Sequence, residues 1–226
     1  MAPLSRTTDR EGWRWEEVAS EGGSEPVDFF FGIGSRYSYL ASTQIEALER
    51  ETGCTVRWRP LYSADLMRLR GRNPFEGPAV SGQYEWSYRQ ADAAAWADYY
   101  GVPFREPLGL QMDPRFLARA CVAAGQLGAL VPFCRALFQA IFVDGPDEIG
   151  AEECARRAET VGLSGAALLE RIEQPAVERE LEAAVEDAHA KGVFGVPSFV
   201  VRGRMFWGND RLVLLRHQLR KLAARG

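Results

Sequence analysis

Histidine and paired cysteine are scarce in this 226-residue sequence. Only His189 and His217 are present, so catalytic triads and zinc sites that depend on histidine have little material. The four cysteines form no CxxC motif and show no zinc-ligand spacing. We therefore expect no metal site. We also expect reduced, mostly buried cysteines, as is typical of a cytoplasmic protein. They are Cys54, Cys121, Cys134 and Cys154.

Long apolar runs and runs of basic residues are also missing. No stretch approaches the roughly 18 apolar residues of a membrane span, and even residues 131–143 contain Arg135 and Gln139. A net charge of −4 without a Lys/Arg run argues against nucleic-acid and membrane-surface partners. Residues 1–25 are polar and lack the apolar region of a signal peptide. We expect them to form a loosely attached extension of a cytoplasmic protein.

The sequence has ample material for a folded core, with 46% hydrophobic and 11% aromatic residues. Residues 26–33 form an apolar run of strand length, followed by an amphipathic stretch that predicts a helix to about Thr52. Gly53 is expected to end that helix, and residues 54–61 alternate as a second strand. This order predicts a βαβ unit with two parallel strands.

The middle of the chain, residues 63–192, is predicted to be almost entirely helical after an irregular stretch at 68–82. Each expected helix has an apolar period near 3.6 and ends at Gly or Pro. These helices are expected over 83–100, 114–128, 129–143, 150–161, 164–172 and 175–191. Residues 197–208 then predict a β-hairpin, and a final helix is expected from Asn209 to about Ala224.

This order predicts an α/β protein with a thioredoxin-like fold and a large all-helical insertion domain. The thioredoxin-like domain would comprise residues 26–62 and 193–226, and the inserted helical domain residues 63–192.

Ser35 lies where the first strand joins the first helix. Its hydroxyl can cap the helix, which would be a purely structural role. The same position can stabilise an anion such as a thiolate, because a helix N-terminus offers free N–H groups and partial positive charge. Disulfide exchange at this site is excluded, because residues 35–38 are Ser-Arg-Tyr-Ser and contain no cysteine.

Two further segments are candidates for binding a ligand. Pro197 at a strand entry is either an ordinary strand-entry proline or part of a cis Val196–Pro197 bond. The cis bond would turn the Val196 backbone outward to pair with an extended peptide. Asn209 and Asp210 either cap the last helix or hold the charged end of a γ-glutamyl group.

Together these segments resemble the 2-hydroxychromene-2-carboxylate isomerases, a glutathione-dependent branch of the DsbA-like thioredoxin superfamily related to kappa-class glutathione transferases. The resemblance runs from about Val27 to the C-terminal helix. Its motifs are DFFFGIGSRYSYLA (28–41), RWRPL (57–61), GRNP (71–74), YYGVPF (99–104), AIFVDGPDEI (140–149) and GVFGVPSFVVRGRMFWGNDRL (192–212).

The resemblance implies a role for each candidate residue. Ser35 would hydrogen-bond the glutathione thiolate. The other glutathione contacts would come from Asn73, Val196, Pro197, Asn209 and Asp210.

The implied reaction is cis–trans isomerisation of an aromatic ring-opened or chromene carboxylate, through reversible addition of the thiolate. A thiol with a pKa of about 8.5 is only a few per cent ionised at neutral pH, so lowering that pKa increases the nucleophile. Candidates for contacting the aromatic substrate are Arg36, Tyr37 and Tyr88. For the two tyrosines, packing in the core or at its rim is the alternative.

The sequence departs from the family at two positions. Arg36 stands where relatives commonly have Pro, and it could depress a thiolate pKa, bind a substrate carboxylate or point to solvent. The Lys that relatives use to neutralise a glutathione carboxylate is missing, since no Lys occurs before Lys191. Either Arg72 or Arg89 replaces it, or the cofactor is another thiol.

Two other functions stay open. A kappa-like transferase would release the thiol adduct instead of reverting it, and a non-catalytic module would bind the thiol or a peptide without turnover. A homodimer formed through the helical insert is expected by family analogy.

Overall fold

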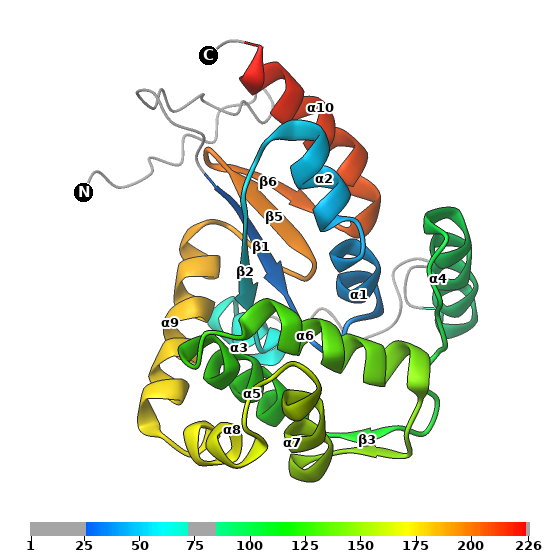
Figure 1. The fold of residues 1–226 in the computed structure, drawn as a ribbon. Helices are drawn as coiled ribbons and strands as arrows, with labels where there is room; N and C mark the ends of the chain where they lie inside the picture. Colours follow the sequence, from blue (N-terminus) through cyan, green and yellow to red (C-terminus); the bar gives the residue numbers. More distant parts are fainter. Residues whose placement is uncertain (1–25, 72–84, 225–226) are drawn as a thin grey trace.

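The computed structural model describes residues 26–71 and 85–224, and its centre is a four-stranded sheet with the order β2-β1-β5-β6 (Figure 1). Strand β1 (Val27–Phe31) runs parallel to β2 (Val56–Pro60), as predicted. On its other side β1 pairs antiparallel with β5 (Ser198–Val201). The predicted hairpin is also confirmed, because β5 pairs antiparallel with β6 (Arg204–Trp207).

The helix predicted to continue to Thr52 is wrong, because the segment forms two helices. Helix α1 spans Arg36–Ser42 and helix α2 spans Ile45–Thr52. At the break, the hydroxyls of Ser42 and Thr43 donate to carbonyls three residues earlier, each at 2.7 Å. Such side-chain bonds compete with the helical backbone pattern. Gly53, with a φ of 67°, ends α2 as predicted.

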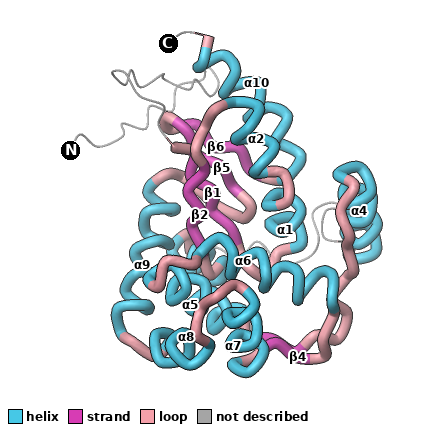
Figure 2. Tube along the Cα trace, in the orientation of Figure 1, coloured by secondary structure: helices cyan, strands magenta, loops and turns pink. Residues whose placement is uncertain are grey.

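Between β2 and β5 the described chain is mostly helical (Figure 2). Six predicted helices are present, although the one predicted over 129–143 ends in a π-helical turn, and α3 was not predicted. The described helices are α3 (Ser63–Leu69), α4 (Trp86–Tyr100), α5 (Pro114–Gln126), α6 (Leu130–Gln139), the π-turn η2 (Ala140–Asp144), α7 (Ala151–Thr160), α8 (Gly165–Ile172) and α9 (Pro175–Ala190). Two short strands, β3 (Gln111–Met112) and β4 (Glu148–Ile149), pair parallel with each other.

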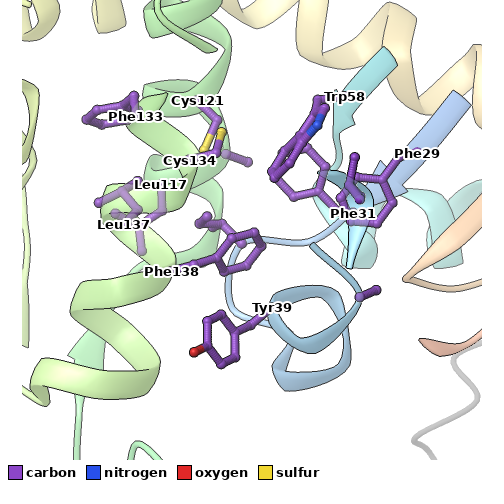
Figure 3. Close-up of a cluster of buried hydrophobic side chains, with 14 of the residues drawn as sticks. Phe29, Phe31, Tyr39, Trp58, Leu117, Cys121, Phe133, Cys134, Leu137 and Phe138 are labelled. Carbon is purple, nitrogen blue, oxygen red and sulfur yellow. The ribbon is translucent and has the colours of Figure 1, made fainter. Parts of the chain in front are cut away.

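One face of the sheet shares its core with the helical insert. Phe31 of β1 and Phe138 of α6 are both buried, and their ring centroids lie 5.8 Å apart (Figure 3). Trp58 of β2 packs edge-on against Phe31 at 5.4 Å. The hydrophobic effect of burying these rings therefore stabilises the sheet and the insert together.

The opposite face of the sheet is covered by α3 and α9. Phe30 points to this side, where it packs in a separate buried cluster with Leu66 of α3 and Val185 of α9. Because side chains alternate along a strand, Phe29 and Phe31 point to one face and Phe30 to the other. Burial on both faces explains why β1 is a continuous apolar run.

The last helical segment differs from the prediction at its start. Asn209–Arg211 form a 3₁₀ turn, η3, and α10 begins at Leu212 and ends at Ala223. No side chain caps either element, so the capping role considered for Asn209 and Asp210 is wrong. None of the helices in residues 26–71 and 85–224 is long and apolar enough to cross a membrane.

The architecture is the predicted α/β thioredoxin-like fold with a mostly helical insertion. The division into two domains stays a prediction.

Candidate functional site

Ser35 ends the loop that follows β1 and caps α1. Its backbone N–H donates to the carbonyl of Gly32 at 3.0 Å, which closes a tight turn. Its Oγ accepts from the N–H of Ser38 at 3.2 Å, so the capping role is present. A hydroxyl also has one proton to donate, and among the described residues Ser35 Oγ donates no hydrogen bond. Capping therefore leaves that proton available for a ligand.

The loop before Ser35 lies close to residues from distant parts of the chain. A Cβ added to Gly32 would lie 3.1 Å from the Oγ of Ser63 and 3.2 Å from a methyl group of Val196. A Cβ added to Gly34 would lie 3.1 Å from the Cε of Met112. The fold thus places Val196 next to Gly32 of this loop. It places Met112, which belongs to the insert, next to Gly34.

The Val196–Pro197 peptide bond is cis, so of the two alternatives that the sequence leaves open, the ordinary strand-entry proline is excluded. The carbonyl of Pro197 accepts from the N–H of Gly208 at 2.9 Å, which joins the start of β5 to the end of β6. Within residues 26–71 and 85–224, neither the N–H nor the carbonyl of Val196 has a hydrogen-bond partner. Its backbone groups can therefore pair with a ligand, which is the role that the cis alternative implies.

Asn209 is 3% exposed, and its Nδ2 has no hydrogen-bond partner in the described part of the chain. Its carbonyl accepts from the hydroxyl of Tyr100 at 3.2 Å, and η3 packs against α1. Asp210 is exposed and lies 3.3 Å from the Nε of Arg211. Of these two candidates, Asn209 is therefore the buried donor that lacks a partner.

Arg36 does not point to solvent, because it is 9% exposed and its Nη2 lies 2.8 Å from the Oε1 of Glu106. Its guanidinium also lies 5.0 Å from the centre of the Trp86 ring. Burial lowers the pKa of Arg36, and burial raises the pKa of Glu106 although the Arg36 charge opposes that change. The residue after Ser35 therefore brings an ion pair to the site rather than a free cation.

Tyr37 and Tyr88 have different surroundings. The hydroxyl of Tyr37 donates to Asp92 at 2.8 Å; burial and then this contact raise the pKa of Tyr37 to about 12. Tyr88 is 58% exposed on α4, so it is not a core residue. Arg89 lies over the rings of Tyr37 and Trp86, at 5.8 and 5.5 Å.

Some predicted residues fall outside the described chain, and some contacts near Ser35 were not predicted. Asn73 and Arg72 lie outside the described residues. Trp86, Glu106 and Met112 were missed, because each approaches this region from a part of the chain far from Ser35 in sequence. No local motif signals such contacts.

The described chain offers no thiolate of its own at this site. Cys121, Cys134 and Cys154 are buried and Cys54 is partly buried, and all four are free thiols. Burial raises the pKa of Cys154 to about 12. No cluster of potential metal ligands occurs among the described residues. A thiolate at Ser35 would therefore have to come from a bound thiol.

Two cavities lie elsewhere in the described structure. One of about 310 Å³ is formed by β6 and the residues after it, and is lined by Arg204, Met205, Phe206, Trp207, Arg211 and Leu214. The other, of about 220 Å³, involves Trp58, Leu130 and Glu180. Neither lining includes a candidate site residue.

Comparison with known proteins places nearly the whole described chain in one family. The family model for the DsbA-like thioredoxin domain matches residues 26–220. A 2-hydroxychromene-2-carboxylate isomerase of Sphingobium xenophagum is 34% identical over 205 residues, which cover 87% of this chain and 98% of that protein. A protein of the same name from Pseudomonas sp. (strain C18) is 27% identical, covering 84% and 87% of the two chains.

Solved structures agree at the level of the fold. A 2-hydroxychromene-2-carboxylate isomerase structure superimposes with a TM-score of 0.76 at 24% identity, covering 89% of this chain and 97% of that one. The cytosolic disulfide reductase DsbM from Pseudomonas aeruginosa, in a structure with GSH, gives a TM-score of 0.59 at 17% identity, with coverage of 87% and 100%.

Proposed function

The chain belongs to the DsbA-like thioredoxin family and, within it, to the 2-hydroxychromene-2-carboxylate isomerases. We propose that it is a glutathione-dependent cis–trans isomerase that acts on an aromatic ring-opened or chromene carboxylate. The observation that carries the proposal is Ser35 at the N-terminus of α1, whose hydroxyl donates no hydrogen bond within residues 26–71 and 85–224. The four residues from Ser35 contain no cysteine, so this site cannot perform the disulfide exchange of related oxidoreductases.

The residues around Ser35 suit glutathione, a tripeptide with an anionic γ-glutamyl end. The backbone groups of Val196, which pair with none of the described residues, match an extended peptide. The buried Nδ2 of Asn209 can donate to a carboxylate. That glutathione accompanies the related fold of DsbM supports this choice of thiol.

When bound, glutathione supplies a thiolate that adds reversibly to a conjugated carbon, so that a double bond becomes a single bond that can rotate. Ser35 donates its hydroxyl proton to the sulfur, and the N-terminal N–H groups of α1 favour negative charge there. Each unit by which the thiol pKa falls corresponds to about 1.4 kcal/mol of preferential binding of the thiolate. One charge-assisted hydrogen bond contributes about 1.5–3 kcal/mol, which is enough for one to two units.

Calorimetry with glutathione tests this proposal on three proteins: the wild type, Ser35→Ala and Ser164→Ala. Ser164 is a matched control because its hydroxyl also caps a helix, α8, by accepting from Ala167 N at 3.3 Å. We expect the wild type and Ser164→Ala to release a proton on binding near pH 7, and Ser35→Ala to bind more weakly with little release. Equal binding by all three proteins would contradict the role of Ser35.

Product analysis with 2-hydroxychromene-2-carboxylate then separates the isomerase from a transferase. An isomerase regenerates glutathione, whereas a kappa-like transferase consumes it. Homodimerisation through the insert stays a prediction that size-exclusion chromatography with light scattering can test.

A further inference from the structure

The ion pair between Arg36 and Glu106 leaves one polar atom of each side chain without a partner in the described part of the chain. Arg36 Nη2 lies 2.8 Å from Glu106 Oε1. By contrast, Arg36 Nη1 and Glu106 Oε2 are buried and have no hydrogen-bond partner among residues 26–71 and 85–224. Arginine and carboxylate frequently form two parallel hydrogen bonds, which would satisfy both atoms. Here only Nη2 and Oε1 are in contact, so the pair offers a ligand one donor, Arg36 Nη1, and one acceptor, Glu106 Oε2.

An exposed aromatic ring and a second cation lie next to the pair. The ring of Trp86 is 5.0 Å from the Arg36 guanidinium and belongs to a residue that is 62% exposed. Arg89 approaches the same ring at 5.5 Å. An exposed indole can stack on a planar aromatic ligand. Arg36 is the first residue of α1, the helix that Ser35 caps, so the ion pair belongs to the same helix end as the candidate thiol site.

We propose that Arg36 and Glu106 are specificity-determining residues that recognise the carboxylate and the hydroxyl of the aromatic substrate. The proposal rests on the proposed function and adds to it the two side chains that read the carboxylate and the hydroxyl of that substrate. Arg36 Nη1 donates to a carboxylate oxygen, and Glu106 Oε2 accepts from the adjacent hydroxyl. Trp86 packs on the aromatic ring, which directs the conjugated carbon toward Ser35.

A purely structural ion pair would not explain the two unpartnered atoms. Joining α1 to the segment around Glu106 needs only the contact between Nη2 and Oε1. Leaving buried polar atoms unpaired costs free energy, and a ligand that pairs with both atoms recovers it.

Binding of a simple probe pair, mandelate and mandelamide, isolates this recognition. Both probes are aromatic 2-hydroxy compounds, and only mandelate carries the carboxylate. Affinities are measured by calorimetry for the wild type, Arg36→Met, the double variant Arg36→Met/Glu106→Gln and a control, Arg105→Met. The control removes a nearby cation whose described contacts are the carbonyls of Asp144 and Gly145.

We expect the wild type and Arg105→Met to bind mandelate about 10- to 100-fold more tightly than mandelamide. Both variants that lack Arg36 should lose this preference. The double variant keeps the test decisive if Arg36→Met fails to fold, because it leaves no buried carboxylate uncompensated. A wild type without the preference, or variants that keep it, would overturn the proposal.

Glutathione affinity, measured in the same series, separates this proposal from the proposed function. Arg36→Met should bind glutathione as the wild type does and should raise KM for 2-hydroxychromene-2-carboxylate with little change in kcat. If no protein binds glutathione, the proposed function fails, whereas the mandelate preference still tests the carboxylate subsite by itself.

Discussion

Replacing Phe138 with alanine should destabilise the sheet and the helical insert together. Phe138 is 1% exposed, and its ring lies 5.8 Å from Phe31 of β1 and 6.0 Å from Tyr39 of α1. Removing a fully buried phenylalanine leaves a cavity and costs about 3–5 kcal/mol of unfolding free energy. Because whole domains are stable by only about 5–15 kcal/mol, the variant should be severely weakened but measurable.

Urea denaturation followed by far-UV circular dichroism and tryptophan fluorescence measures this loss. We expect one coincident transition for both probes, shifted to lower urea in Phe138→Ala. The control Leu108→Ala removes an apolar side chain that is 77% exposed and should change the free energy by about 0.5 kcal/mol or less. Two separate transitions in the wild type, or a loss in Phe138→Ala no larger than in the control, would refute the shared core.

Three further predictions follow from the site and its surroundings. Asn209→Ala should weaken glutathione binding about 10-fold or more in calorimetry, because the amide would lose a charge-assisted hydrogen bond. In the folded protein a colorimetric thiol reagent should modify only Cys54, with all four thiols reacting after unfolding. The reason is that Cys54 alone is partly exposed, whereas Cys121, Cys134 and Cys154 are buried. Burial raises the pKa of Cys54 too, so its reaction should quicken as pH rises. The pKa of Tyr37 rises from 10.0 to about 12, so the folded state holds its proton more tightly than the unfolded chain. That stability is present below about pH 10 and is lost as pH rises through about 12, so the advantage of wild type over Tyr37→Phe in urea titrations should shrink across that interval.

The strands and the main helices could be predicted because their signals are local. The apolar run of β1 reflects burial on both faces, and Gly53 ends α2 because its φ of 67° suits glycine. The break between α1 and α2 could not be predicted from apolar spacing, because the apolar period continues through it. It depends on where the hydroxyls of Ser42 and Thr43 point.

In the candidate site, too, features within one short segment could be predicted, whereas contacts between distant segments could not. Ser35 as a helix cap follows from a short motif, and Pro197 at a strand entry marks a possible cis bond. The structure decides that the bond is cis and places Val196 beside the loop that precedes Ser35. The pairing of Arg36 with Glu106 joins residues far apart in the chain, and no spacing rule predicts it. Sequence alone left three roles open for Arg36; only the folded arrangement excludes the solvent-facing one.

The buried polar atoms without partners distinguish structural groups from those suited to a ligand. Among the described residues, Arg119 Nε and Arg216 Nε lack a hydrogen bond but lie 3.5 and 3.3 Å from the carboxylates of Glu178 and Glu51, which already balance their charge. Asn209 Nδ2 has no such neighbour, and it belongs to the turn that packs on α1. The unpartnered Nη1 of Arg36 belongs to α1 itself. The two remaining donors without a partner among the described residues, Asn209 Nδ2 and Arg36 Nη1, thus both lie at α1. Binding of an anionic thiol and an anionic substrate at that helix requires such donors there.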